Sequence, residues 1–350
     1  MREPFAAPDP AEVARVVLVQ LHFLGDTLLT TPALRALRRR FPEARIEALV
    51  KRRCLAVLER NPNVDLLTPY DPPSIWERPL YWRRLARRWD AERVDLCVDF
   101  TGDGRSARML RAMRPRRAVG ILRAADDPLV QAGVPRSCGM RHVARHFLDL
   151  AALAGAPGEE PMEFHPSEGA RREAAAFRAR THGPLIAIHA GGNEPKRRWP
   201  LERFAAAAQA LTASAGARVW AAGSRAERPL GERLARDASA LDLTGRTTID
   251  QMAALFEASD LVIANDSGPL HLAAAVGTPT LALFGPSHPA TCAPIGAGHA
   301  FLHGRAEGCP CAGKHCARGA ESCLHRITPD MVADAAARLL AQGRRLERAR

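Results

Sequence analysis

Short apolar runs alternate with longer amphipathic stretches along most of the chain. In the first half, runs rich in β-branched residues predict buried strands at 16–19, 46–50, 64–67 and 94–100. Helical patterns separate these runs, which is typical of a parallel sheet with helices on both faces. The pattern returns after residue 183, with strands expected at 185–189, 219–222, 261–264 and 280–284. We therefore predict two α/β domains in succession.

A Gly/Pro-rich segment, 154–161, separates a helix ending near Leu153 from another expected at 168–180. The length of 350 residues suits two domains, each with its own core. We predict an N-terminal tail at 1–14, a first Rossmann-like domain at 15–160, a second at 161–328, and a C-terminal helix at 329–350.

Composition indicates a folded, cytoplasmic protein. The first ten residues lack the basic-then-apolar order of a secretory signal, and no apolar run has the roughly 18 residues that a membrane span needs. Cys54 and Cys97 lie inside strand-like or helix-like stretches, so we expect reduced core thiols rather than disulfides. The net charge of +12 rests on arginine, since Lys51, Lys196 and Lys314 are the only lysines. An anionic partner and ordinary solvated helix faces both explain this charge.

The first expected strand runs into a glycine turn that carries Asp26. In open α/β sheets, ligands bind beyond the carboxyl ends of the strands, so Asp26 is placed to act in chemistry. We expect a helix to open at Thr27 and to continue through Pro32. A helix N-cap is the alternative role, because Asp fills that position very often.

Two segments of the second half predict an anion site. The loop that follows 185–189 contains Gly192, Asn193 and the consecutive cations 196–198, and glycines and cations together can hold phosphate oxygens. The strand at 261–264 leads to Asn265, Asp266 and a helix start at which Ser267 can cap. The amides of that helix start favour a diphosphate, and His271 lies one turn further along the face of Ser267.

Two other motifs suggest different chemistry. Gly102, Gly104 and Ala107 match the dinucleotide pattern G-x-G-x-x-A of dehydrogenases, but they follow the fourth strand of their domain rather than the first. A second motif consists of four cysteines, Cys309, Cys311, Cys316 and Cys323. Their spacings differ from those of paired C-x2-C zinc knuckles, so both a metal site and a loop of reduced thiols remain open. An enzyme that uses nucleotide sugars can bind a divalent cation through an Asp-x-Asp pair, and no such pair occurs in this chain. For a substrate of that class, cations and helix amides would have to neutralise the diphosphate leaving group.

Three segments together resemble glycosyltransferase family 9, which holds the ADP-heptose:lipopolysaccharide heptosyltransferases. They are Leu24-Gly25-Asp26-Thr27 through Leu34, Lys196 through Pro200, and Asn265 through Pro286. The resemblance covers about 15–335 and implies the α/β GT-B fold, in which two Rossmann-like domains face a central cleft. The first domain then binds the acceptor and the second binds the nucleotide-sugar donor. Neither a cofactor nor a metal is implied.

The resemblance also assigns roles to residues. Asp26 matches the proposed general base, and the family's phosphate-binding lysine stands where this chain has Arg197, with Lys196 one step earlier. The expected donor-binding residues are Gly192, Asn193, Lys196, Arg197, Glu227 at the ribose, Thr247 near the adenine, Asp266, Ser267, Gly268 and His271.

The implied reaction is an inverting, metal-independent transfer of heptose from ADP-heptose to a lipopolysaccharide core precursor. Peripheral contact with the inner membrane is expected, and nucleic acid is not an expected partner. Another donor, a protein acceptor, a nucleotide-sugar epimerase and a non-catalytic binding protein remain alternatives, and acceptor identity, linkage and oligomeric state stay open. One further hypothesis is that an arginine-rich segment serves the acceptor: Arg105, Arg108, Arg111, Arg114, Arg116, Arg117 and Arg123.

Overall fold

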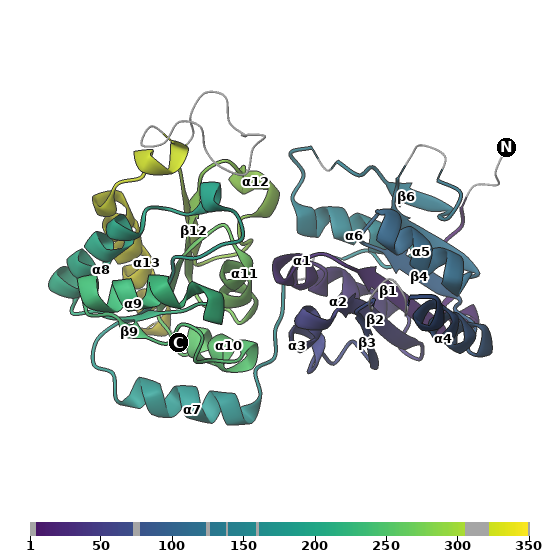
Figure 1. Cartoon of the computed structure of the whole chain (residues 1–350), viewed down its shortest axis with the longest axis horizontal. Helices are drawn as coiled ribbons and strands as arrows, with labels where there is room; N and C mark the ends of the chain where they lie inside the picture. The colour runs from purple at the N-terminus through teal and green to yellow at the C-terminus, as the bar shows by residue number, and fades with distance from the viewer. Residues whose placement is uncertain are drawn as a thin grey trace. The chain divides into compact units, whose positions relative to one another are not determined.

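The chain folds into two compact units, Met1–Met162 and Glu163–Arg350 (Figure 1). The computed structural model describes residues 5–72, 78–123, 127–137, 139–158, 161–304 and 322–348. None of the helices described there is long and apolar enough to cross a membrane.

The first unit is built on a parallel six-stranded sheet of order β3-β2-β1-β4-β5-β6. Its strands are β1 Arg15–Gln20, β2 Arg45–Lys51, β3 Leu66–Tyr70, β4 Leu96–Asp99, β5 Arg117–Ile121 and β6 Ala132–Val134. Every residue of β1 and β4 is buried, as expected for central strands covered on both faces. This order reverses direction between β1 and β4, which is the point where doubly wound sheets bind ligands.

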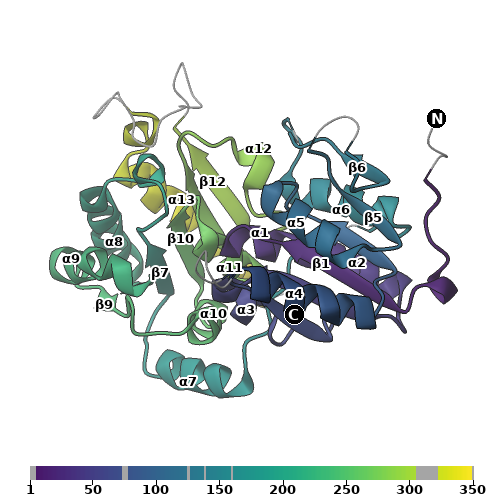
Figure 2. The ribbon, with the colours of Figure 1, turned by 45° about the vertical axis from the view of Figure 1, so that its right-hand side comes forward.

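Two helical layers cover this sheet. Its helices are α1 Leu24–Leu29, α2 Thr31–Arg40, α3 Leu55–Leu58, α4 Arg78–Ala91, α5 Gly104–Met113 and α6 Val143–Leu153. Helix α2 packs against α6 in one layer and α4 packs against α5 in the other (Figure 2). Leu85 and Trp89 of α4 share one core cluster with Leu110 of α5 and Val17 of β1, so α4 and α5 cover the same face.

The second unit repeats the same topology, with strand order β12-β11-β10-β7-β8-β9. Its strands are β7 Leu185–His189, β8 Arg218–Ala221, β9 Leu241–Asp242, β10 Leu261–Asn265, β11 Thr280–Phe284 and β12 His299–His303. Its helices are α7 Glu168–Ala179, α8 Leu201–Ala215, α9 Arg228–Ala238, α10 Ile249–Glu257, α11 Gly268–Ala275, α12 Pro289–Cys292 and α13 Pro329–Arg348. The C-terminal helix α13 packs against α8 over this sheet and so belongs to the second unit (Figure 1).

The structure differs from the sequence expectation at the first helix. That helix begins at Leu24 rather than at Thr27, and a second helix begins at Thr31. Pro32 lies in the first turn of α2 and has no N–H to continue the helix from α1. The hydroxyl of Thr31 instead donates to the carbonyl of Leu28 at 2.7 Å. The break therefore follows from the proline and is stabilised by the threonine.

Strand β3 also differs from the prediction, which placed it at 64–67. It runs from Leu66 to Tyr70 and includes Pro69, and it forms one edge of the sheet. An edge strand accepts proline because one side of its backbone needs no partner. Cys54 and Cys97 are buried and free, as expected for reduced core thiols.

Candidate active site

Asp26 lies in the first turn of α1, just beyond the end of β1. Its Oδ2 accepts a hydrogen bond from the backbone N–H of Phe23, the N-cap residue, at 3.0 Å. Asp26 is thus not the N-cap itself but the third helical residue, whose carboxylate reaches back to the cap. The carboxyl group is half-buried, and no described residue donates a hydrogen bond to its Oδ1. One oxygen therefore remains able to accept a proton.

Cations gather beside Asp26 at the same edge of the sheet. The Phe23 ring is 47% exposed, and Lys51 Nζ and Arg53 Cζ each lie 4.8 Å from its centroid. Burial lowers the pKa of Lys51, and the neighbouring Arg53 lowers it further. Burial also lowers the pKa of His22, an effect that the Asp26 carboxylate opposes. Sequence reasoning did not select these neighbours, although Lys51 ends β2 and could have been found from that position.

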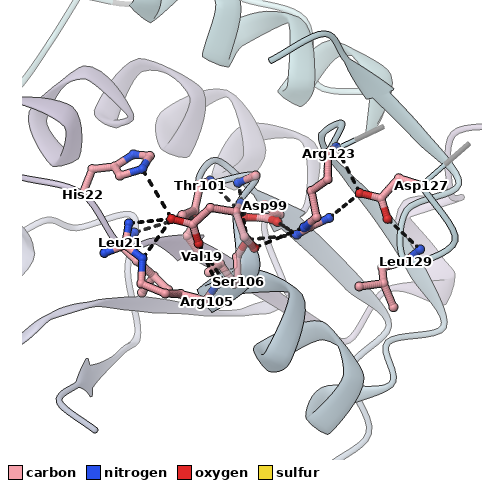
Figure 3. Close-up of polar contacts among 12 residues, drawn as sticks. Val19, Leu21, His22, Asp99, Thr101, Arg105, Ser106, Arg123, Asp127 and Leu129 are labelled. Carbon is pink, nitrogen blue, oxygen red and sulfur yellow. Dashed lines mark hydrogen bonds and ion pairs between the residues drawn. The ribbon is translucent and has the colours of Figure 1, made fainter. Parts of the chain in front are cut away.

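The loop between β4 and α5 holds the start of the β1–α1 loop in place (Figure 3). The Asp99 carboxylate is buried and accepts hydrogen bonds from the N–H groups of Thr101, at 2.9 Å, and Gly102, at 3.2 Å. The Thr101 hydroxyl in turn accepts the N–H of Leu21 at 2.8 Å. Gly102 has φ +61°, and a Cβ there would overlap the side chain of Ile121. The chain leading to Asp26 therefore rests on a tightly built neighbouring loop.

Arg123 closes this loop from the other side (Figure 3). Its guanidinium forms an ion pair with Asp99 and another with Asp127 at 2.6 Å. It also donates to the hydroxyl of Ser106 at 2.9 Å and to the carbonyl of Asp103 at 3.2 Å. Burial raises the pKa of the Asp99 carboxyl, and the Arg123 charge opposes that rise.

Most backbone amides of the glycine pattern at 102–107 are already hydrogen-bonded within the loop. The Asp103 carboxylate caps α5 by accepting the N–H groups of Arg105, at 2.8 Å, and Ser106, at 3.3 Å. A dinucleotide fingerprint needs such amides for its pyrophosphate. Asp103 also lies 3.9 Å from Nε2 of His22. We therefore assign this turn to support of the β1–α1 loop.

The arginine-rich segment that follows is not a single cluster. Arg105 pairs with Asp103 at 2.6 Å, and Arg123 pairs with Asp99 and Asp127. Arg117 instead lies 3.8 Å from Glu12. Arg114 lies 2.7 Å from Asp90, so four arginines of this segment have carboxylate partners within the first unit.

In the second unit, Asn265 organises the loop that follows β7. Its Nδ2 donates to the carbonyls of Ala190, at 3.0 Å, and Gly191, at 2.9 Å, and its Oδ1 accepts the N–H of Trp199 at 2.9 Å. Because β7 and β10 are neighbours, this contact joins the two strand ends at the switch point of the second sheet.

The three consecutive cations of this loop have different partners. Arg197 Nη1 lies 2.9 Å from Asp266 Oδ2, and Arg197 Nε lies 3.1 Å from the carboxylate of Glu194. Lys196 Nζ lies 3.7 Å from the same carboxylate. Arg198 donates to the carbonyl of Gly192 at 2.8 and 2.6 Å. Arg198 thus braces the loop, while Lys196 and Arg197 remain the candidates for an anion.

Asp266 directly follows strand β10, and its side chain is buried among polar groups. It accepts a hydrogen bond from Ser287 at 2.5 Å and pairs with Arg197. Cys292 Sγ lies 3.7 Å from its Oδ1, and burial raises the pKa of that thiol to about 12, with Asp266 adding to the effect. The Ser287 hydroxyl and the Arg197 guanidinium therefore both donate to Oδ2 of Asp266.

Helix α11 begins at Gly268, with Ser267 at the N-cap position. The Ser267 hydroxyl forms no capping bond and instead contacts Nδ1 of His189 at 3.1 Å and the carbonyl of Asn265 at 3.0 Å. The expected capping hydrogen bond of Ser267 is therefore not formed, and no side chain in the described part of the chain caps the first amides of α11. His271 is buried one turn further along. A helix start of this kind favours a phosphate.

Glu227 joins the loops after β7 and β8. Its Oε1 accepts the N–H of Gly192 at 3.0 Å, and its Oε2 accepts the hydroxyl of Ser224 at 2.7 Å. Although burial opposes it, contacts with His189 and Ser224 hold the pKa of Glu227 well below its usual range. Asn193 is exposed in the same loop, and Thr247 is half-buried between β9 and α10.

No group of three or more His, Cys, Asp or Glu side chains in the described residues is arranged to hold a metal ion. Of the cysteine cluster, Cys309, Cys311 and Cys316 lie outside the described residues, and Cys323 is buried.

Comparisons with known proteins agree with this architecture. The family model described as "Glycosyltransferase family 9 (heptosyltransferase)" matches residues 82–320. The chain is 27% identical over 348 residues to lipopolysaccharide heptosyltransferase 1 of Pseudomonas aeruginosa, covering 91% of this chain and 96% of that protein. It is 25% identical to lipopolysaccharide heptosyltransferase 2 of Escherichia coli K12, covering 79% of this chain and 84% of the relative.

Solved structures show the same fold. A family 9 glycosyl transferase from Veillonella parvula matches with a TM-score of 0.83 at 24% identity, over 96% of this chain and 99% of that chain. The E. coli ADP-heptose lipopolysaccharide heptosyltransferase II matches with a TM-score of 0.75 at 22% identity, over 94% and 99% of the two chains. The fold is therefore GT-B, and the chain is a glycosyltransferase that belongs to family 9, the heptosyltransferase family.

Proposed function

We propose that this protein transfers heptose from ADP-heptose to the lipopolysaccharide inner core, by an inverting reaction that needs no metal. The observation that carries the proposal is that each of the two sheets of this family 9 chain has different chemistry at its switch point. The first presents the open oxygen of Asp26, and the second presents Arg197 beside the uncapped start of α11. The named relatives, which are lipopolysaccharide heptosyltransferases, support the choice of sugar and acceptor.

The donor diphosphate is assigned to the second unit. Lys196 and Arg197 supply positive charge, and the first amides of α11 supply hydrogen bonds aided by the helix dipole. When the diphosphate binds, Arg197 would turn in part from Asp266 to the phosphate oxygens. The Asp266 carboxylate could then accept a hydrogen bond from a sugar hydroxyl. The remaining donor-binding assignments are Gly192, Asn193, Glu227, Thr247, Ser267, Gly268 and His271.

In the proposed step, Asp26 removes the proton from an acceptor hydroxyl while the oxygen attacks the anomeric carbon. The new bond to that carbon forms as its bond to the diphosphate oxygen breaks, and the electron pair leaves with ADP. A single displacement inverts the anomeric configuration. Lys196, Arg197 and the α11 amides stabilise the charge that develops on ADP.

The direct test is transfer in vitro. The purified protein is incubated with ADP-heptose and a heptose-deficient lipopolysaccharide precursor, and the product is analysed by mass spectrometry. We expect the precursor to gain one heptose, with ADP as the second product and no gain for the Asp26→Asn variant. A faster reaction with another nucleotide sugar, or with a protein acceptor, would replace the proposed substrates. A deletion strain should correspondingly make lipopolysaccharide that lacks this heptose.

A further inference from the structure

Five arginines form one exposed basic surface on the outer side of the α4–α5 layer. We call them the arginine face: Arg83, Arg84 and Arg87 on α4, and Arg108 and Arg111 on α5. The opposite sides of both helices are buried, through Leu85 and Trp89 on α4 and Leu110 on α5. Since these helices pack side by side over one face of the first sheet, their exposed sides form a continuous surface (Figure 2).

The arginine face lacks the counter-charges that a solvated helix surface normally carries. Within the described residues, its five guanidinium groups form neither an ion pair nor a hydrogen bond. Two nearby arginines do have partners: Arg88 turns inward to Glu47 at 2.6 Å, and Arg114 uses Asp90 at 2.7 Å. Asp90, the exposed acidic residue of α4, is therefore already paired with Arg114 and does not neutralise the arginine face.

Helix α7 of the second unit shows the ordinary arrangement. Arg171 pairs with Glu257 at 2.8 Å, Arg172 lies 3.7 Å from Glu168, and Arg178 lies 3.3 Å from Asp260. Surfaces that interleave both signs of charge avoid this kind of repulsion. Single exposed arginines without a partner among the described residues also occur in the second unit, for example Arg180 and Arg236. The arginine face differs because it gathers five such cations on two adjacent helices, where an external anion would reduce their repulsion.

The place of this face in the fold indicates which anion. In a parallel sheet each helix starts near the carboxyl edge of the strands, so α4 and α5 both begin at the edge that carries Asp26. Leu80, in the first turns of α4, is 58% exposed beside the arginines. An exposed apolar residue next to a row of cations is typical of a surface that lies on lipid headgroups.

We propose that the arginine face, with Leu80, docks the first unit on an anionic phospholipid bilayer. This inference rests on the proposed function for its choice of partner, because a lipid-linked acceptor is presented at such a surface. A bilayer is favoured over nucleic acid because the cations spread over two adjacent helices together with an apolar side chain. Docking there brings the edge that carries Asp26 to the membrane, where the acceptor hydroxyl is found.

The test measures binding to vesicles that contain no acceptor. The full-length protein is floated with vesicles of phosphatidylglycerol and phosphatidylcholine, or of phosphatidylcholine alone. We expect binding to the anionic vesicles, weakened by added salt, and little binding to the neutral ones. Replacing all five arginines of the face with Gln should lower the partition coefficient about tenfold or more.

A matched variant removes the same charge elsewhere. It replaces five exposed arginines of the second unit with Gln: Arg172, Arg180, Arg218, Arg233 and Arg236. Both variants are checked by circular dichroism and thermal melting. The proposal predicts that this control binds anionic vesicles almost as well as the unaltered protein. If both variants lost vesicle binding equally, the binding would depend only on the net charge of the protein, and the proposal would be overturned.

Two further measurements test the identity of the partner and distinguish the docking surface from the proposed function. Tighter binding to a DNA duplex than to anionic vesicles, abolished by the same five changes, would assign the face to nucleic acid and overturn the bilayer. Transfer to a water-soluble, deacylated acceptor is measured in parallel with the unaltered protein. Failure of that reaction alone would refute the proposed function, whereas failure of vesicle binding alone would refute the docking surface.

Discussion

Asp26 combines two roles in one carboxylate. Oδ2 is committed to the N–H of Phe23 and so stabilises the start of α1, whereas Oδ1 faces no donor among the described residues. This division keeps the side chain in one orientation without using both acceptors. If Asp26 is the base, as proposed, it would lose little conformational freedom when an acceptor hydroxyl arrives.

The first prediction follows from that division. In Asp26→Asn, the amide oxygen can still accept the Phe23 N–H, so helix α1 should form as before, but the side chain can no longer take a proton. We expect kcat to fall between about a hundredfold and ten-thousandfold, with the KM for the donor nearly unchanged. Steady-state kinetics and a thermal melt measure the two effects. Turnover close to normal in a well-folded variant would remove Asp26 from the mechanism.

At the scale of elements, one loop positions another. The β4–α5 loop contacts the chain between β1 and Asp26 through the buried hydroxyl of Thr101, which accepts the N–H of Leu21. Asp99 and Arg123 orient Thr101 in turn, through the backbone of the loop. Thr101 touches no reacting atom in the proposed mechanism, so it is a positioning residue.

Thr101→Val tests this arrangement. The variant leaves the buried N–H of Leu21 without its acceptor, which should lower the free energy of unfolding by about 1–3 kcal/mol. If the loop positions Asp26, kcat should fall about tenfold more than the loss of folded protein explains, while the KM for the donor stays constant. Thr101→Ser should restore both values. Thr278→Val, a buried Thr variant in the second unit, is the control for stability alone. An equal kcat in Thr101→Val and Thr278→Val would mean that the loop is merely structural.

The elements also show what a sequence can and cannot predict. Strands β7 and β11 match their predicted bounds, because both are largely apolar, buried throughout and flanked by a strand on each side. Strands β5, β6, β9 and β12 were not predicted. The reasons are physical: Gly120 and Arg117 weaken the pattern of β5, β9 has two residues, and β6 and β12 are only partly buried.

The same distinction holds for the candidate sites. Asp26 and Asp266 were found because each follows the end of a central strand. Contacts such as Gly192 with Glu227, 35 residues apart, depend on how strands align in the sheet, and no local pattern encodes that alignment. Phe23 and Arg53 were missed for the same reason, whereas Lys51 could have been found from its place at the end of β2.

In the whole molecule, two units with one topology carry complementary chemistry. The switch point of the first sheet holds a carboxylate, and that of the second holds cations and a helix start. A proton acceptor and a site for a leaving diphosphate are the two requirements of an inverting transfer from a nucleotide sugar. In the proposed reaction each unit would supply one of them, so the chemistry would be divided between two domains with the same topology.

The last prediction concerns charge neutralisation in that transfer. The sequence contains no Asp-x-Asp pair, and the proposed mechanism assigns stabilisation of the leaving diphosphate to Lys196, Arg197 and the amides of α11. Transferase activity should therefore persist in excess EDTA, to within about twofold of the untreated rate, because positioned cations and amides replace a metal. Loss of activity that Mg²⁺ or Mn²⁺ restores would instead assign the diphosphate to a divalent ion. Restoration by Zn²⁺ alone would point to the cysteines at 309, 311, 316 and 323, and metal analysis of the purified protein would then show a stoichiometric ion.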